Sequence, residues 1–190
     1  MSLILASKSP RRRDILEALG LTFTVLTAPT DETLPEGICP REGVCLLARR
    51  KGAAVVPLCP SDATVLSSDT LVELDGEPLG KPQDEAQACA MLRRLSGRAH
   101  NVHTGIAVHS TGQVFSDVAT TRVYFRPLSE EQIAAYVASG EPMDKAGAYG
   151  IQGAAGAFVE RIEGDMDTVI GLSSRLTLRL LREAGWEVAR

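Results

Sequence analysis

Residues 3–20, LILASKSPRRRDILEALG, predict a short buried strand that runs directly into a helix. The apolar run SLILA is typical of a strand inside a sheet, and the apolar residues of ILEAL fall on one face of a helix. Ser9 fits the N-cap, Pro10 fits the first helical position, and Gly20 fits the end of the helix. A buried strand followed at once by a helix is typical of α/β proteins.

The charges in this first helix run against the helix dipole. Arg11, Arg12 and Arg13 occupy the first turn, where the partial positive charge of the N-terminus favours acidic residues. The predicted helix at 83–97 follows the rule, since it begins with two acids and ends with two arginines. The first helix therefore has its cations in an unfavourable place.

An anion bound at this helix start explains the arrangement. Free backbone N–H groups, Ser7, Ser9 and the guanidinium groups together predict a site for a polyanion such as a phosphate chain. The alternative is a solvated basic patch, because the dipole penalty is only about 0.3–1 kcal/mol for each charge. Of the three arginines, Arg13 is expected to lie at the surface.

The rest of the chain predicts an α/β fold with a mixed sheet flanked by helices. A helix is expected at about 40–56, and the segment ATVLSSDTLVEL is expected to form a strand, a polar interruption and a second strand that turns at Asp75–Gly76. Two long strands, RAHNVHTGIAVH and QVFSDVATTRVYF, are expected to be joined by a hairpin turn. With no linker or repeat, we expect one domain over residues 1–190.

Composition limits the class of function. The net charge is −4, and 44% of the residues are hydrophobic, so neither a general nucleic-acid binder nor a membrane-surface binder is indicated. No run of about 18 apolar residues predicts a membrane span. The four cysteines form no CxxC pair and are expected to be reduced and mostly buried, and His100 and His103 should point to opposite faces of a strand, which disfavours a zinc site. We expect a cytoplasmic protein.

A second chemical centre lies in VLSSDTLVELDGEPLGKP. Asp69 follows an apolar run, and a carboxylate at a strand end can hold Mg²⁺ or deprotonate an attacking water. Lys81, beyond the hairpin, is placed to neutralise phosphate charge. The alternative for Asp69 is an aspartate that forms a turn.

Three further residues are candidates of lower specificity. Glu32 is a possible second metal ligand or a solvated loop residue. Lys51 follows Arg49 and Arg50 on a helix and is either a site residue or part of an exposed basic face. Gln152, in YGIQGAAG, either reads a base edge or is an ordinary loop residue among glycines that permit close backbone approach. No Walker A pattern is present, which disfavours a P-loop kinase or GTPase.

Four separated motifs together resemble one known family. LASKSPRR, SSDTLV…LGKP, HNVHTG and EPMDKAGAYGIQG…VIGL occur in the order and spacing of the Maf (septum formation inhibitor-like) nucleotide pyrophosphatases, over nearly the whole chain. KAGAYGIQG resembles the branch that acts on dTTP and UTP. The segment GLSS at 171–174 departs from the family, which usually has proline after the leucine; Ser173 is expected to cap the last helix instead.

This resemblance implies a fold related to the inosine-triphosphate pyrophosphatases, a nucleotide-binding cleft and, often, a homodimer. It implies metal-dependent hydrolysis, with Mg²⁺ or Mn²⁺, of a nucleoside triphosphate to the monophosphate and pyrophosphate. The implied role is cleaning of the nucleotide pool, with a link to the arrest of cell division.

The resemblance also implies site residues. Asp69 matches the proton acceptor, and Glu32 matches an acidic position near the metal, so that both are candidate metal ligands. Phosphate-side positions are matched by Ser7, Arg11, Arg12, Lys51 and Lys81. Positions linked to base preference are matched by Arg12, Thr70 and Gln152.

Two rival functions remain open from the sequence. A nucleotide-sensing regulator of division would bind the triphosphate without turnover, although it would have no need of a water-activating carboxylate. A phosphatase would release the terminal phosphate as orthophosphate.

Overall fold

The computed structural model describes residues 2–187, which contain one seven-stranded sheet. The strand order is β2-β1-β3-β5-β6-β7, and β4 pairs with β3 outside this path. The strands are β1 Leu3–Leu5, β2 Thr24–Val25, β3 Thr64–Leu74, β4 Glu77–Leu79, β5 Ala99–Ser110, β6 Gln113–Phe125 and β7 Val159–Glu163. β1 runs parallel to β2 and β3, whereas β3/β4 and β6/β7 are antiparallel. The predicted mixed α/β sheet is therefore confirmed.

The helices begin and end close to their predicted positions, except α5, which was not predicted. They are α1 Pro10–Ala18, α2 Pro40–Val55, α3 Glu85–Leu95, α4 Glu130–Ala138, α5 Met166–Ile170 and α6 Ser174–Glu183. Local capping explains the agreement, because Asp84 and Ser129 accept hydrogen bonds from the first turns of α3 and α4. Ser173 Oγ accepts from the Leu176 N–H at 3.3 Å, so its predicted role as the cap of the last helix is confirmed.

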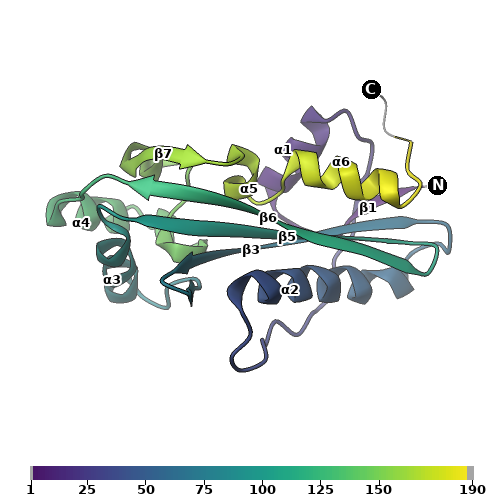
Figure 1. The fold of residues 1–190 in the computed structure, drawn as a ribbon, viewed down its shortest axis with the longest axis horizontal. Coiled ribbons are helices and arrows are strands. Elements are labelled where there is room, and N and C mark those ends of the chain that lie inside the picture. Colours follow the sequence, from purple (N-terminus) through teal and green to yellow (C-terminus); the bar gives the residue numbers. More distant parts are fainter. Residues whose placement is uncertain (1, 188–190) are drawn as a thin grey trace. The chain divides into compact units, whose positions relative to one another are not determined.

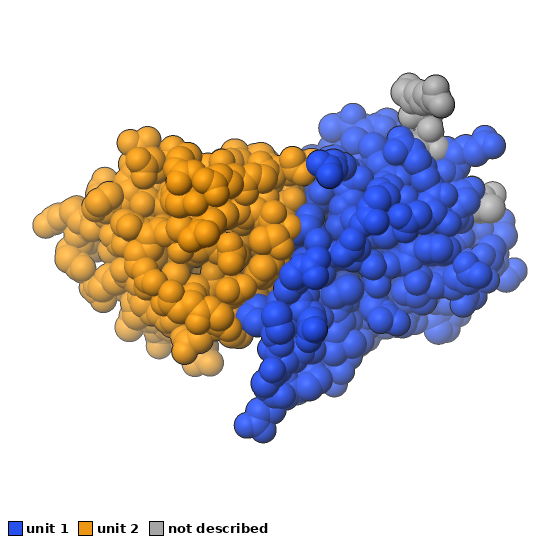
Figure 2. All heavy atoms as spheres, viewed as in Figure 1, with its two compact units in different colours: residues 1–70, 104–119, 171–190 blue, residues 71–103, 120–170 orange. Residues whose placement is uncertain are grey.

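The chain divides into two compact units, coloured separately in Figure 2. Unit 1 consists of residues 1–70, 104–119 and 171–190, and unit 2 consists of residues 71–103 and 120–170. Strands β3, β5 and β6 contribute residues to both units.

In unit 1, helices cover both faces of the strands. α1 and α6 lie on one face and α2 lies on the other (Figure 1). On the face covered by α1 and α6, Leu16 and Leu180 of these helices pack with Leu5 and Leu66 of the strands. On the opposite face, Val55 of α2 is buried with residues of β1 and β3.

Two glycines allow α2 to lie very close to the strands. A Cβ atom on Gly52 would lie 2.4 Å from His109 Nε2 and 2.7 Å from Ser67 Oγ. A Cβ atom on Gly105 of β5 would lie 2.4 Å from the carbonyl oxygen of Val44 in α2. Larger residues would force the helix away from the sheet. This contact sets the position of the helix that carries Lys51.

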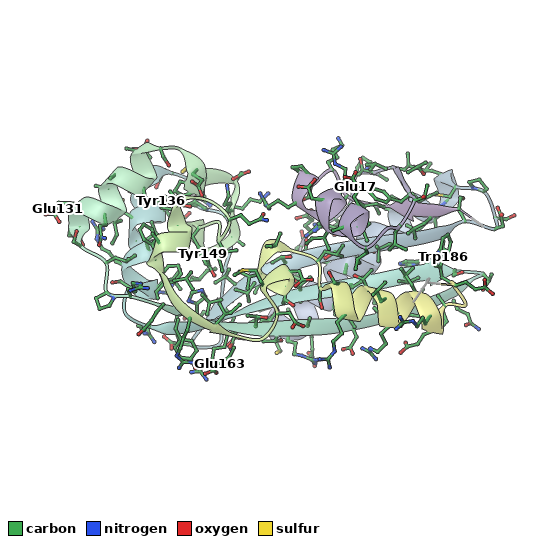
Figure 3. All side chains as sticks on the ribbon, turned by 90° about the horizontal axis from the view of Figure 1, so that it is seen from above. Glu17, Glu131, Tyr136, Tyr149, Glu163 and Trp186 are labelled. Carbon is green, nitrogen blue, oxygen red and sulfur yellow. The ribbon has the colours of Figure 1, made fainter. Side chains whose placement is uncertain are left out.

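Unit 2 has its own core, which is rich in aromatic rings. Phe125 and Tyr149 pack edge to face at a centroid distance of 4.8 Å, and Tyr136 packs on Phe158 at 5.2 Å; Tyr136 and Tyr149 are labelled in Figure 3. Buried His100 hydrogen-bonds the Tyr149 hydroxyl at 2.8 Å, and burial lowers the pKa of His100 to about 4. The imidazole is therefore neutral at pH 7.

Three sequence-based expectations need correction. β3 is one continuous strand, because its polar residues find partners on both faces instead of interrupting it. Ser9 precedes α1 as predicted, but its side chain makes no capping bond. The cysteines are unpaired, as expected, yet Cys39 is exposed and Cys45, Cys59 and Cys89 are only partly buried. Across residues 2–187, the helices are too short or too polar to cross a membrane.

Candidate active site

The polar stretch of β3 presents its side chains alternately to the two faces of the strand. Ser67 Oγ donates to the Ala48 carbonyl of α2 at 2.7 Å, whereas Ser68 Oγ donates to the Gly171 carbonyl at 2.9 Å. Asp69 shares the face of Ser67, and Thr70 shares the face of Ser68, because side chains alternate along a strand. Two groups of polar residues therefore meet at this part of β3, one on each face.

The first group is centred on Lys51 of α2. Lys51 Nζ donates to Asp69 Oδ1, and it lies 2.9 Å from Glu32 Oε1. The side chains of Lys51 and Asp69 are only 20% and 14% exposed, whereas that of Glu32 is 61% exposed. Lys51 is thus no part of a solvated basic face, and Asp69 lies within a strand and forms no turn.

The second group is centred on Arg12 of α1. Its Nε donates to the Gly171 carbonyl at 2.8 Å, Nη1 donates to Ser7 Oγ at 3.1 Å, and Nη2 donates to Thr70 Oγ1 at 3.4 Å. Burial lowers the pKa of Arg12, and the nearby charge of Asp69 acts in the opposite direction. Arg12 therefore lies in the field of Asp69, and a freely solvated arginine is excluded.

The other residues at the start of α1 differ in exposure. Ser7 is buried, and its Oγ also accepts the Ser9 N–H at 3.2 Å. Arg11 is half-buried, and its charge lowers the pKa of Arg12. Arg13 is exposed, which confirms the sequence-based expectation.

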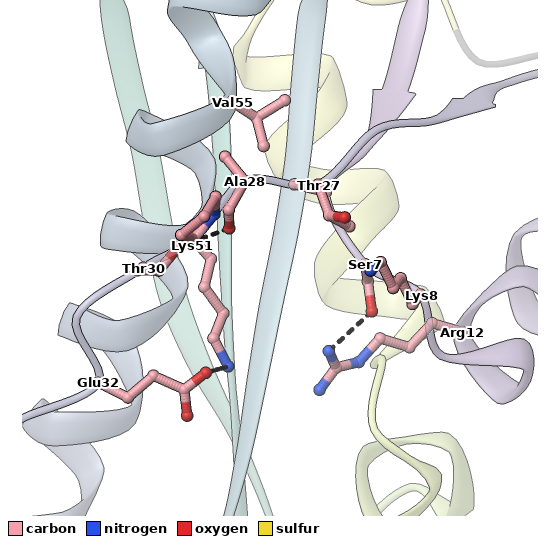
Figure 4. A pocket seen from close by; sticks show the side chains of 11 residues that line it. Ser7, Lys8, Arg12, Thr27, Ala28, Thr30, Glu32, Lys51 and Val55 are labelled. Carbon is pink, nitrogen blue, oxygen red and sulfur yellow. Dashed lines mark hydrogen bonds and ion pairs between the residues drawn. The ribbon is translucent and has the colours of Figure 1, made fainter.

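A pocket of about 340 Å³ joins several of these residues (Figure 4). Ser7 and Arg12 lie on one side of it, and Lys51 and Glu32 lie on the other. The full lining is Ala6, Ser7, Lys8, Arg12, Thr27, Ala28, Pro29, Thr30, Glu32, Lys51 and Val55. Sequence reasoning missed Lys8, although it stands inside the motif LASKSPRR and adds a third cation to the lining.

Lys81 and Gln152 belong to unit 2, and both are exposed. Their segments are linked within that unit, because the Gly147 N–H donates to the Gly80 carbonyl at 3.0 Å. The loop before Gln152 is held further by the Gly150 N–H, which donates to the Tyr136 hydroxyl at 3.2 Å.

Asp69 and Glu32 are the candidate metal ligands of this site. Both carboxylates approach the same ammonium group, so their oxygens already converge on one positive charge. Mg²⁺ commonly takes one or two carboxylates and completes its shell with waters and substrate phosphates. Two carboxylates beside a pocket lined by cations fit such an ion.

The histidines have separate environments. His100 pairs with Tyr149, whereas His103 Nε2 hydrogen-bonds Glu73 Oε2 at 2.6 Å. Buried His109 packs against Gly52, and burial lowers its pKa. Within residues 2–187, no group of three or more His, Cys, Asp or Glu side chains is placed to hold a metal ion.

Curated relatives cover almost the full length of this chain. A protein of Pelotomaculum thermopropionicum named dTTP/UTP pyrophosphatase is 48% identical over 188 residues, which are 98% of each chain. Proteins of the same name from Bacillus velezensis and Thermus thermophilus are 47% and 49% identical and cover 95% and 97% of this chain and 95% of their own chains.

Solved structures give weaker likenesses. The Ham1 protein of Staphylococcus aureus is 18% identical with a TM-score of 0.43, and the match covers 70% of this chain and 88% of that one. A nucleoside-triphosphatase, dITP/XTP pyrophosphatase, of Mycobacterium abscessus is 12% identical with a TM-score of 0.41, over 74% and 95% of the two chains.

The family model described as Maf-like protein matches residues 2–184. This match and the full-length relatives confirm the resemblance seen in the four sequence motifs. The chain belongs to the Maf-like protein family.

Proposed function

We propose that this protein hydrolyses nucleoside triphosphates, with dTTP and UTP as substrates, to the nucleoside monophosphate and pyrophosphate. Relatives that are 47–49% identical over nearly the whole chain carry the name dTTP/UTP pyrophosphatase. The proposal also accounts for the cations at the start of α1, which oppose the helix dipole unless an anion binds there.

One observation carries the proposal. Lys51, which lines a pocket together with Arg12, binds the carboxylates of Asp69 and Glu32 at the same time. A triphosphate needs cations to hold it, and its hydrolysis needs a base for the attacking water. Both kinds of group occur here within one unit of the fold.

The proposed reaction is an in-line displacement at the α-phosphorus. A water oxygen forms a bond to the α-phosphorus. The bond from the α-phosphorus to the oxygen that bridges to the β-phosphate breaks, and pyrophosphate leaves with that oxygen. Asp69 accepts the proton of the water. Ser7, Lys8, Arg11 and Arg12 bind phosphate oxygens, and Lys51 offsets the charge that develops in the transition state.

A divalent cation, Mg²⁺ or Mn²⁺, is proposed as the cofactor. Asp69 and Glu32 would hold it, and when bound it would supply positive charge to the phosphates. Both carboxylates contact Lys51 Nζ, so the ion would compete with this ammonium for their oxygens.

Lys81 and Gln152, which belong to unit 2, are proposed as substrate residues on the strength of the family resemblance. We propose that Lys81 neutralises phosphate charge and that Gln152 contacts the base edge. Thr70 and Arg12, in unit 1, match further positions linked to base preference. The hydrogen bonds from Gly147 and Gly150 hold the backbone of the loop that leads to Gln152.

Product analysis tests the proposal. Purified protein with dTTP and Mg²⁺ is expected to release one pyrophosphate for each dTMP, and omission of the metal or addition of EDTA is expected to stop the reaction. Release of orthophosphate would favour the phosphatase alternative. Tight binding of dTTP without turnover would favour a nucleotide-sensing regulator of division.

We also propose a cytoplasmic homodimer that acts on free nucleotides and binds neither nucleic acid nor membranes. The four free cysteines are typical of a reducing compartment, and the net charge of −4 disfavours general binding to nucleic acid. Light scattering of the purified protein tests the dimer.

A further inference from the structure

The orientation of Arg12 depends on one backbone carbonyl group. A guanidinium has five N–H donors in a fixed plane. In Arg12, Nε donates to the Gly171 carbonyl, and each Nη donates to one hydroxyl, of Ser7 or Thr70. Hydroxyl groups rotate to suit their partners, whereas a carbonyl direction is fixed by the backbone. The bond to Gly171, at 2.8 Å, is also the shortest of the three.

The Gly171 carbonyl is itself held by Ser68. Ser68 is fully buried in β3, and its Oγ donates to the same oxygen at 2.9 Å. A carbonyl oxygen has two lone pairs, so Ser68 and Arg12 Nε together satisfy it. The strand that carries Asp69 therefore fixes the acceptor that orients Arg12.

The backbone of Gly171 is suited to this contact. Its φ of +128° lies in a region that side chains rarely adopt. A Cβ atom there would lie 3.3 Å from Thr70 Oγ1 and 3.5 Å from Arg12 Nε. A side chain at position 171 would therefore crowd Thr70 and strain the backbone beside Arg12.

We infer that Gly171 and Ser68 are positioning residues for nucleotide recognition, because they fix the Arg12 guanidinium and leave its two remaining Nη hydrogens for the substrate. The inference rests on the proposed function, in which Arg12 contacts the nucleotide. Neither residue touches the substrate, and both act through Arg12. A loss of the Ser68 hydroxyl should thus change how nucleotides are bound and distinguished more than it changes folding.

Ser67 supplies a matched control. It is the neighbouring serine of β3 and is equally buried, but its Oγ shares its proton between the carbonyls of Ala48 in α2 and Ala107 in β5. Ser67→Ala and Ser68→Ala each remove one buried hydroxyl from the same strand. Only Ser68→Ala removes a bond to the Gly171 carbonyl.

The first readout needs no catalysis. In the nucleotide-free protein, solvent exchange of the Arg12 Nε–H is followed by ¹⁵N NMR, with the signal assigned by its loss in Arg12→Lys. Ser68→Ala is expected to speed this exchange about tenfold, the upper end of what one neutral hydrogen bond contributes. Ser67→Ala is expected to leave it unchanged. Equal exchange rates in the two variants would overturn the inference.

The second readout is nucleotide selection. Ser68→Ala is expected to raise the KM for dTTP and to lower the ratio of kcat/KM for dTTP over GTP by about tenfold, whereas Ser67→Ala leaves this ratio unchanged. If the two variants have equal thermal stability and equal ratios of kcat/KM for dTTP over GTP, Ser68 has only a structural role.

The two readouts separate the inference from the proposed function. If the protein does not hydrolyse dTTP, the proposed function is refuted. The NMR exchange rate would still report on the contact of Arg12 with Gly171 and Ser68. The affinity for dTTP, measured by calorimetry, would then replace the kinetic ratio. Should Ser68→Ala fail to fold, Ser68→Cys keeps a group of similar shape with a weak donor. The same faster exchange is then expected, and its absence would count against the inference.

Discussion

Lys51 of α2 and Asp69 of β3 form a direct ion pair although 18 residues separate them in the chain. Both side chains are largely buried, and Glu32 joins the same ammonium at 2.9 Å. Removing a lysine and its two carboxylate partners from water is costly. Such costly groups of charges are typical of functional sites, and a site that binds a polyanion would explain this one.

Replacing Asp69 with Asn should lower kcat by about 100-fold or more, because the amide cannot accept the proton of the attacking water. The side chain keeps its shape, so the affinity for dTTP in metal-free buffer should change little. Steady-state kinetics and calorimetry measure the two effects, with Asp14→Asn on the exposed face of α1 as the control. Near-normal turnover in Asp69→Asn would exclude the proposed base.

Lys51→Gln should raise the affinity for Mn²⁺ in the absence of nucleotide by about threefold or more. The reason is that removal of the ammonium frees both carboxylates and removes a like charge near the ion. Electron paramagnetic resonance of free Mn²⁺ measures the affinity, and Arg49→Gln, exposed on the same helix, is the control. An unchanged or weaker affinity would place the metal elsewhere.

Gly52→Ala should destabilise the protein by about 1–3 kcal/mol, because the new methyl group overlaps His109 and Ser67 in a packed interior. Since α2 must shift to relieve the overlap, kcat should also fall through Lys51. Gly43→Ala on the same helix meets Leu34 Cδ1 at 2.9 Å, the end of a flexible side chain, and should cost less. Urea denaturation and kinetics of both variants test this order, and the reverse order would contradict the account.

Acid should destabilise unit 2 through His100. Burial lowers the pKa of His100 to about 4, below its ordinary value of 6.5, so the unfolded chain binds the proton more readily. The stability that comes from the neutral imidazole is complete above pH 6.5 and decreases as the pH falls toward 4, by about 2–3 kcal/mol.

His100→Gln isolates this effect, since the carboxylates that titrate in the same range are common to both proteins. Urea denaturation followed by circular dichroism at pH 7, 5.5 and 4.5 should give a shallower pH dependence for the variant. Parallel curves for the two proteins would show that His100 does not titrate as described.

Local signals in the sequence were sufficient for much of the fold. Ser129, Ser173 and the Asp75–Gly76 turn act through neighbours a few residues away, so their roles could be predicted without the tertiary structure. The supposed break in β3 was wrong because Ser67 and Ser68 have partners on α2 and at Gly171 that lie far along the chain.

The candidate site was predictable only in part for the same reason. The arginines at the start of α1 stood out because they oppose the helix dipole. The partner of Arg12, the carbonyl of Gly171, lies 159 residues away and carries no side chain that could signal it. Lys51 looked like one of several surface cations, since its burial depends on how closely Gly52 and Gly105 let α2 approach the sheet.

Hydrolysis of dTTP in H₂¹⁸O tests the central claim most directly. Mass spectrometry of the products of the Mg²⁺-loaded protein should find one ¹⁸O atom in dTMP and none in pyrophosphate, with the labelled product strongly reduced in Asp69→Asn. Label in pyrophosphate, or labelled orthophosphate beside dTDP, would show attack at a different phosphorus and contradict the account.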